Sequence, residues 1–150
     1  NKNYYATMVM AGDKMNEELI TFSTFNHSDA LDFGLRVIEI AKKEKLKPLR
    51  IRVSIDGDIV FQYLMDGKTS DLWLNRKENT VLKTKQSSMN VFNNQDFYKN
   101  IVDDENYAIC GGGYPLIVAN EFKGVFCISG LEHYEDHALI VRVLKEMKNR

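Results

Sequence analysis

The segment from Tyr107 to His137 constrains the fold more than any other part of the chain. It holds two apolar runs joined by a polar turn. The first run opens at three consecutive glycines, Gly111–Gly113, and the second closes at Ser129-Gly130 before an acidic, histidine-bearing helix start. Glycines at the ends of elements mark backbone that turns with positive φ or passes close to another group. That group is a ligand, another subunit or a neighbouring strand.

Length and composition predict one folded domain and exclude two classes of partner. A chain of 150 residues with 44% apolar residues is long enough to bury a core without a metal or a disulfide. Its net charge of −1 provides no field that attracts nucleic acid or an anionic membrane surface. No apolar run reaches the roughly 18 residues that span a bilayer. We therefore expect neither a nucleic-acid partner nor a membrane association.

The two cysteines and the N-terminal segment predict a cytoplasmic location. Cys110 and Cys127 both lie in apolar runs, where a reduced, buried thiol is favoured over a disulfide or a metal pair. Residues 1–13 have no sustained apolar core and do not form a secretory signal. We expect a single domain over residues 1–150, with residues 1–13 as a poorly ordered or interface segment.

Apolar periodicity predicts helices on both sides of the central region. After a short helix over Lys14–Leu19, a clear helix is capped by Ser28 or Asp29. Its apolar positions recur at three- and four-residue steps: Leu31, Leu35, Ile38 and Ala41. Gly34 within it indicates close packing on a sheet. Ser70 caps a helix that runs to about Lys85, and its inward residues are Leu74 and Val81. The last helix, Asp136–Lys148, carries the apolar stripe Leu139, Ile140, Val143, Leu144 and Met147.

The strands alternate with turn signals. Five strands are predicted, over residues 51–55, 59–65, 107–110, 116–119 and 123–129. Asp56-Gly57 and Asn120-Glu121 are the hairpin turns. The second strand is apolar on both faces, so we expect it inside the sheet. Ser87–Asn94 is expected to be irregular. Helices that bracket paired antiparallel strands define an α+β domain.

Six segments together resemble the UPF0303 family, within the haem-degrading-domain (glycolate-operon-protein-like) superfamily. They are Leu46–Val53, Gly57–Tyr63, Met65–Gly67, Trp73–Lys77, Gly111–Leu116 and Ser129–His137. The resemblance extends over residues 14–148. It implies a profilin-like fold, a five-stranded antiparallel sheet flanked by helices, and a homo-oligomer. It also implies haem or a related tetrapyrrole as a candidate ligand, or else a protein-interaction role.

The glycine-rich turn and the tyrosine after it, Gly111, Gly112, Gly113 and Tyr114, form the first half of the candidate ligand site. Such a turn can present backbone amides to a ligand. It lacks the Lys-Ser/Thr of a phosphate loop, and no capped helix follows it. The alternative is a bend in a strand at a crowded packing site.

Glu132, His133 and His137 form the second half of the site. Two histidines four residues apart share one helix face and can bind a metal or haem iron. The alternative has Asp136 capping the helix and both rings in hydrogen bonds or at a subunit contact. Because acidic residues already occupy this helix start, a cation or a metal centre suits it better than a phosphate.

The leading hypothesis is a cytoplasmic, oligomeric binding protein whose site joins the glycine-rich turn to the two histidines. His133 or His137 would be the axial donor to haem, although the sequence leaves the cofactor unassigned. The second hypothesis is a protein-interaction scaffold without a small ligand. A haem-degrading enzyme is the weakest, because no distal catalytic group is evident. Without a nucleophile motif, no catalytic residue is predicted.

Overall fold

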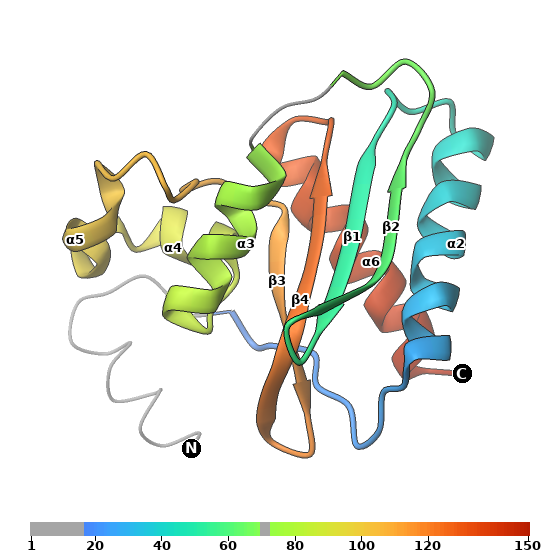
Figure 1. Ribbon diagram of the computed structural model, residues 1–150, viewed down its shortest axis with the longest axis horizontal. Helices are drawn as coiled ribbons and strands as arrows, with labels where there is room; N and C mark the ends of the chain where they lie inside the picture. Colours follow the sequence, from blue (N-terminus) through green and yellow to red (C-terminus); the bar gives the residue numbers. More distant parts are fainter. Residues whose placement is uncertain (1–16, 70–72) are drawn as a thin grey trace.

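The structure is a computed structural model that describes residues 17–69 and 73–150. One antiparallel sheet, in the order β2-β1-β4-β3, separates α2 and α6 on one face from α3 on the other (Figure 1). The strands are β1 (Arg50–Ile55), β2 (Asp58–Leu64), β3 (Gly113–Val118) and β4 (Glu121–Ser129). The helices are α2 (His27–Lys43), α3 (Trp73–Thr84), α4 (Ser88–Asn93), η1 (Gln95–Tyr98), α5 (Lys99–Val102) and α6 (His133–Lys148). The predicted α+β architecture is confirmed.

Some of the sequence predictions fall on residues outside this description. They are the N-terminal segment over residues 1–13 and the helix cap at Ser70. The helix predicted over Lys14–Leu19 lies partly outside it, and its described end, residues 17–19, is not helical. Within the two described ranges, no helix is both long enough and apolar enough to cross a bilayer.

Strand β4 lies between β1 and β3, and both of its faces are buried from Gly124 to Ser129. Phe126 and Ile128 point into the main core, which α2 and α6 cover, whereas Val125 and Cys127 pack with residues of α3. This alternation is the two-residue period expected of a strand covered on both sides. Cys127 is fully buried and Cys110 is half-buried, and both thiols are free.

The hairpin turns follow from local sequence. Asp56 and Gly57 both have positive φ, at 52° and 85°, as the tight turn between β1 and β2 requires. The turn between β3 and β4 is centred on Ala119 and Asn120, with φ of 51° and 66°. It therefore lies one residue before the predicted Asn120-Glu121.

The sheet has four strands, and the predicted strand over residues 107–110 does not form. Its backbone bonds to α3 instead: the Ala108 N–H donates to the Arg76 carbonyl at 3.1 Å, and the Ala108 carbonyl accepts from the Thr80 hydroxyl at 2.9 Å. An isolated parallel bridge from Phe22 to Val118 continues the sheet beyond β3. The prediction of five strands was wrong because this segment pairs with a helix.

Strand β2 lies at the edge of the sheet, so the prediction of an interior position was wrong. It pairs with β1 alone, and the register shifts between Val53 and Ser54. Only Val60 and Phe61 are half-buried, and the remaining residues are exposed. A strand that is apolar on both faces therefore leaves apolar side chains in solvent here.

Helix α2 is rotated relative to its predicted orientation. Leu31 and Leu35 are exposed. The buried residues are Ala30, Phe33, Gly34, Val37, Ile40 and Ala41. Gly34 explains the rotation, since a Cβ at this position would overlap the ring of Phe61 on β2. The close packing predicted for Gly34 is thus confirmed. The helix cap is Asn26, whose N–H donates to the Asp29 carboxylate at 2.7 Å.

The remaining helices confirm one stripe and correct two boundaries. Every residue of the stripe predicted in the last helix is buried. That helix begins at His133, because Glu132 is its N-cap and forms a capping box with Glu135. The segment predicted to be irregular, Ser87–Asn94, contains α4, and the Ser87 hydroxyl caps it by accepting from the Asn90 N–H at 3.0 Å.

Candidate functional site

The fold brings the glycine turn, Gly111–Gly113, against the start of α6. The Gly111 N–H donates to Nδ1 of His133 at 2.9 Å. The turn leads directly into β3, which pairs with β4, and α6 follows β4 in the chain. Sheet pairing therefore places two segments that are 22 residues apart in contact.

The space that the three glycines leave is filled by the chain itself. A Cβ at Gly111 would lie 2.6 Å from the Met89 methyl and 3.0 Å from the Cβ of His137, and it would overlap the His133 carbonyl. A Cβ at Gly113 would lie 2.9 Å from the backbone of Lys77. The glycines therefore allow α3, α4 and α6 to approach the turn, and no hollow for a guest opens on their Cβ side.

Beneath the glycine turn lies a buried ion pair between α3 and α6. Nζ of Lys77 is 3.0 Å from a carboxylate oxygen of Asp136, and the two side chains are 4% and 1% exposed. The ammonium also donates to the Ile128 carbonyl at 3.1 Å. Gly112 makes room for it, since a Cβ there would lie 2.6 Å from Nζ.

The environment of Asp136 pulls the pKa of its carboxyl group in two directions. Burial raises the pKa from its ordinary value of 3.8 to about 6. The Lys77 charge and the Leu131 N–H, which donates to the carboxylate at 3.0 Å, act in the opposite direction. Burial is the larger effect, so this carboxyl group keeps its proton to a higher pH than an exposed aspartate does.

The ion pair was not predicted from the sequence, although the sequence contains a signal that Lys77 is buried. Only Leu74 and Val81 were predicted to face inward from this helix, and Asp136 was considered as a helix cap. Lys77 lies three residues after Leu74 and four before Val81, so all three share one helix face. A lysine on a stripe otherwise occupied by buried apolar residues indicates a buried partner. The partner itself is 59 residues away and has no local signal.

His137 and Tyr114 hold the segment that precedes α2. Nε2 of His137 lies 3.3 Å from the Glu17 carboxylate, and the Tyr114 hydroxyl accepts from the Ile20 N–H at 2.8 Å. Tyr114 is in the core, where burial raises its pKa to about 12. Nδ1 of His137 is buried and has no hydrogen-bond partner within residues 17–69 and 73–150. The two histidines thus have separate partners rather than one shared opening.

His133 lies in an exposed aromatic patch, which we define as Phe92, His133 and Tyr134. The ring centroids of Phe92 and His133 are 4.8 Å apart, and those of His133 and Tyr134 are 6.1 Å apart. Because Nδ1 of His133 accepts a hydrogen bond from Gly111, the neutral ring carries its proton on Nε2. This conformation offers an N–H donor and not a lone pair for iron.

The neighbouring charged residues have different surroundings. Glu132 is exposed and serves as the N-cap of α6. Arg52 is paired with Glu78 at 2.8 Å on the α3 face of the sheet, and Arg76 stacks over Trp73 at 4.6 Å. No cluster of three metal-ligating side chains forms within the described parts of the chain.

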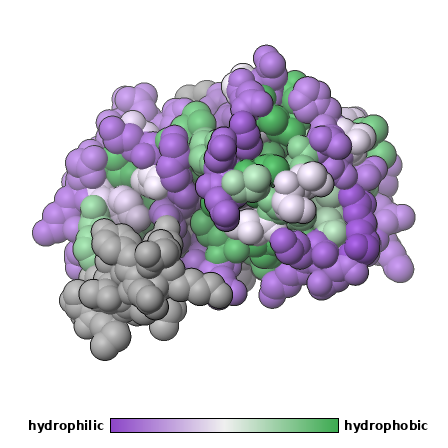
Figure 2. All heavy atoms as spheres, turned by 90° about the horizontal axis from the view of Figure 1, so that it is seen from below, coloured by the Kyte–Doolittle hydropathy of each residue, from purple (hydrophilic) through white to green (hydrophobic). Residues whose placement is uncertain are grey.

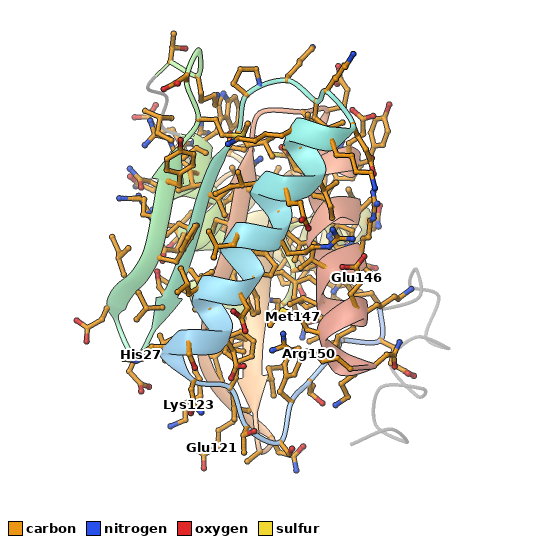
Figure 3. All side chains as sticks on the ribbon, turned by 90° about the vertical axis from the view of Figure 1, so that its right-hand side faces the viewer. His27, Glu121, Lys123, Glu146, Met147 and Arg150 are labelled. Carbon is orange, nitrogen blue, oxygen red and sulfur yellow. The ribbon has the colours of Figure 1, made fainter. Side chains whose placement is uncertain are left out.

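A shallow hollow of about 340 Å³ lies at the other end of α6. The lower face of the molecule shows apolar residues between hydrophilic ones (Figure 2). Phe22, Phe25 and Met147 provide apolar lining, and Arg150 borders the hollow with an ion pair to Asp29 at 3.1 Å (Figure 3). Helix α6 separates this hollow from the glycine turn by roughly 20 Å, at 1.5 Å per residue.

The four-stranded antiparallel sheet with helices on both faces makes this chain a small α+β domain. The sequence pattern of the family described as "Haem degrading protein HbpS-like" matches residues 25–145. A UPF0303 protein of Schizosaccharomyces pombe is 34% identical over 140 residues, which cover 87% of this chain and 78% of that protein. The chain therefore belongs to the HbpS-like family and to its UPF0303 group.

Two solved structures are similar to this fold. The Ybr137w protein has a TM-score of 0.76 and 28% identity, with 87% of this chain and 82% of the other covered. A structure titled as a PduOC:heme complex has a TM-score of 0.66 and 15% identity, with 81% and 94% covered. At that identity, the second likeness concerns the fold alone.

Proposed function

We propose that this protein binds haem or a related flat tetrapyrrole on the aromatic patch. The family description and the haem complex of a protein with a similar fold support this class of ligand. The contact between His133 and the Gly111 N–H carries the proposal, because it fixes an imidazole beside exposed aromatic rings. His133 is the contacting residue, and Gly111 is a positioning residue behind it.

The patch suits the face of a flat ligand. Phe92 and Tyr134 are 39% and 59% exposed, so their rings offer apolar surface to a ligand. Stacking on each ring contributes about 0.5–1.5 kcal/mol beyond the area that is buried. Nε2–H of His133 donates to a carboxylate oxygen of the ligand.

Iron ligation by His133 requires a change in the protein. Nε2 must lose its proton, so Nδ1 would carry one and could no longer accept from Gly111. A buried N–H left without a partner costs about 1–3 kcal/mol. We therefore expect the tetrapyrrole ring to provide most of the affinity, with His133 unligated. When bound, haem would supply its iron for redox or ligand-sensing chemistry.

Titration of the full chain with haemin and with metal-free protoporphyrin IX tests the proposal. We expect both to bind with affinities within about tenfold, since 1.4 kcal/mol separates tenfold steps. Phe92→Ala should weaken both ligands about tenfold. Phe97→Ala is the matched control, since Phe97 is a 52% exposed phenylalanine of η1. His133→Asn keeps an acceptor for Gly111 and removes Nε2. No change in the Soret band, or equal effects of Phe92→Ala and Phe97→Ala, would refute the proposal.

An interaction scaffold is the second candidate. The exposed apolar residues of α2 and β2 favour it. Strand β2 is at the opposite edge of the sheet from β3. If neither tetrapyrrole binds, this function remains.

A further inference from the structure

Arg76 on α3 is a cation for which the described parts of the chain provide no carboxylate partner. Its neighbour Lys77 is paired with Asp136, whereas the Arg76 side chain makes one hydrogen bond to a described residue, from Nη2 to the Tyr107 carbonyl at 3.3 Å. Nε of Arg76 is buried and has no acceptor among the described residues. Because a guanidinium carries five N–H donors and stays charged in proteins, most of the binding capacity of Arg76 is unused.

The indole of Trp73 holds this guanidinium in place. Cζ of Arg76 lies 4.6 Å from the centroid of the Trp73 ring, within the range in which a cation is attracted to the face of an indole. Stacking uses the flat face of the guanidinium, and the N–H donors point outward from its edge. The side chain is therefore oriented by an aromatic contact and not by an ion pair.

The segment over residues 106–108, which lies along α3, forms the second wall of this site. The Asn106 carbonyl accepts from Nδ2 of Asn79 at 2.9 Å, and the Ala108 N–H donates to the Arg76 carbonyl at 3.1 Å. These two bonds fix the Tyr107 carbonyl that lies between them and accepts from Nη2 of Arg76. Helix and segment thus hold the guanidinium from two sides.

We propose that Arg76 binds the carboxylate of a small organic acid whose flat ring lies against Trp73. A carboxylate can accept two parallel N–H bonds from one edge of a guanidinium. The Trp73 side chain is 48% exposed, so it offers stacking surface to the rest of the ligand. The helix dipole near the start of α3 also favours negative charge. None of these residues belongs to the aromatic patch, so the site is separate from that of the proposed function.

The neighbouring acidic turn favours a monoanion over a phosphate dianion. Asp104 and Glu105 come shortly before Tyr107, and the Tyr107 N–H donates to the Asp104 carbonyl at 3.0 Å. The two carboxylates of this turn repel an approaching anion in proportion to its charge. A single negative charge on a planar group therefore fits the site better than a compact double charge.

Fluorescence of Trp73 tests the proposal in the full chain, because Trp73 is the only tryptophan. The probes are sodium benzoate, sodium acetate and inorganic phosphate, each compared with sodium chloride at the same ionic strength. We expect benzoate to cause a saturable change in emission. Acetate should bind more weakly because it has no ring to stack, and phosphate should also bind more weakly than benzoate.

Three variants test the role of Arg76. Arg76→Gln should weaken benzoate binding about tenfold, since it removes the charge and the paired donors. Arg76→Lys keeps the charge without the two-donor edge and should lose less affinity than Arg76→Gln. Arg50→Gln is the matched control, because Arg50 also has a buried Nε without an acceptor in the described residues but lies on β1. It should keep the affinity of the wild type. No saturable benzoate signal, equal losses in Arg76→Gln and Arg50→Gln, or tighter binding of phosphate than of benzoate would overturn the proposal.

Discussion

At the scale of single residues, Lys77 and Asp136 control the packing beneath the glycine turn. A buried charge that loses its partner costs far more than the pair contributes. We predict that Lys77→Met lowers the free energy of unfolding by about 3–5 kcal/mol, measured by urea denaturation. Lys83→Met, on an exposed position of α3, should stay within about 0.5 kcal/mol of wild type.

The double variant Lys77→Met/Asp136→Leu tests whether the charges of the ion pair or the packing of the two side chains stabilise the turn. Replacing both partners by apolar side chains of similar size removes the uncompensated carboxylate. We expect it to recover part of the stability that Lys77→Met loses, because the Leu131 N–H still lacks its acceptor. If the double variant is as unstable as the single one, packing around the Lys77 stem rather than the ion pair holds the turn.

The titration of Asp136 gives stability an unusual dependence on pH. The pKa of this carboxyl group is about 6 in the folded protein, above its ordinary value of 3.8, so the folded state binds the proton more tightly. The free energy of unfolding should therefore fall as pH rises from about 4 to about 6, by up to about 3 kcal/mol, and level off above.

Asp136→Asn should remove this slope, which urea denaturation at a series of pH values would detect. Hydrogen bonds from Arg142 and Arg36 lower the pKa values of Glu44 and Glu146 from 4.5, which gives a slope of opposite sign at acidic pH that remains in both proteins. Parallel pH profiles for the wild type and the variant would contradict the assignment.

At the scale of elements, alanine substitutions in glycine turns test whether the space left by a missing Cβ atom is needed for close packing. Gly112 has φ of +126°, and its missing Cβ leaves room for Lys77. Gly57 also has positive φ, at +85°, but a Cβ there would meet nothing within 4 Å. Both alanine variants incur the cost of the unusual φ, about 1–2 kcal/mol. We predict that Gly112→Ala loses about 1–3 kcal/mol more, by thermal or urea unfolding. Equal losses would mean that the space is not needed.

The elements that local sequence determines were predictable. The stripe of α6 and the turn at Asp56-Gly57 depend on residues a few positions apart, and both predictions were confirmed. The close approach at Gly34 was also confirmed, but its consequence was not foreseen. By bringing Phe61 against the helix, it rotates Leu31 outward.

The failures come from contacts between distant segments. The strand predicted at residues 107–110 bonds to α3, and the edge position of β2 follows from the pairing of β1 with β4. The candidate site likewise contains one contact that was expected and one that was not. The adjacency of Gly111 and His133 was expected, but the Lys77 side chain that fills the space near Gly112 arrives from another helix. Periodicity within one element carries no information on such a partner.

At the scale of the whole molecule, the two ends of α6 are different surfaces. The patch of Phe92, His133 and Tyr134 is at its start, and the hollow bordered by Phe22 and Arg150 is at its end. Our account assigns the tetrapyrrole to the first surface. Because the two surfaces lie at opposite ends of one helix, variants of residues that line the hollow should leave tetrapyrrole binding unaffected.

Amide chemical-shift mapping of the full chain during titration with metal-free protoporphyrin IX tests the central claim most directly. The Gly111 amide reports on its bond to His133, and we predict that it shifts together with the amides of Phe92 and Tyr134. Shifts confined to Phe22 and Arg150 at the far hollow, or no shifts at saturating ligand, would contradict the account.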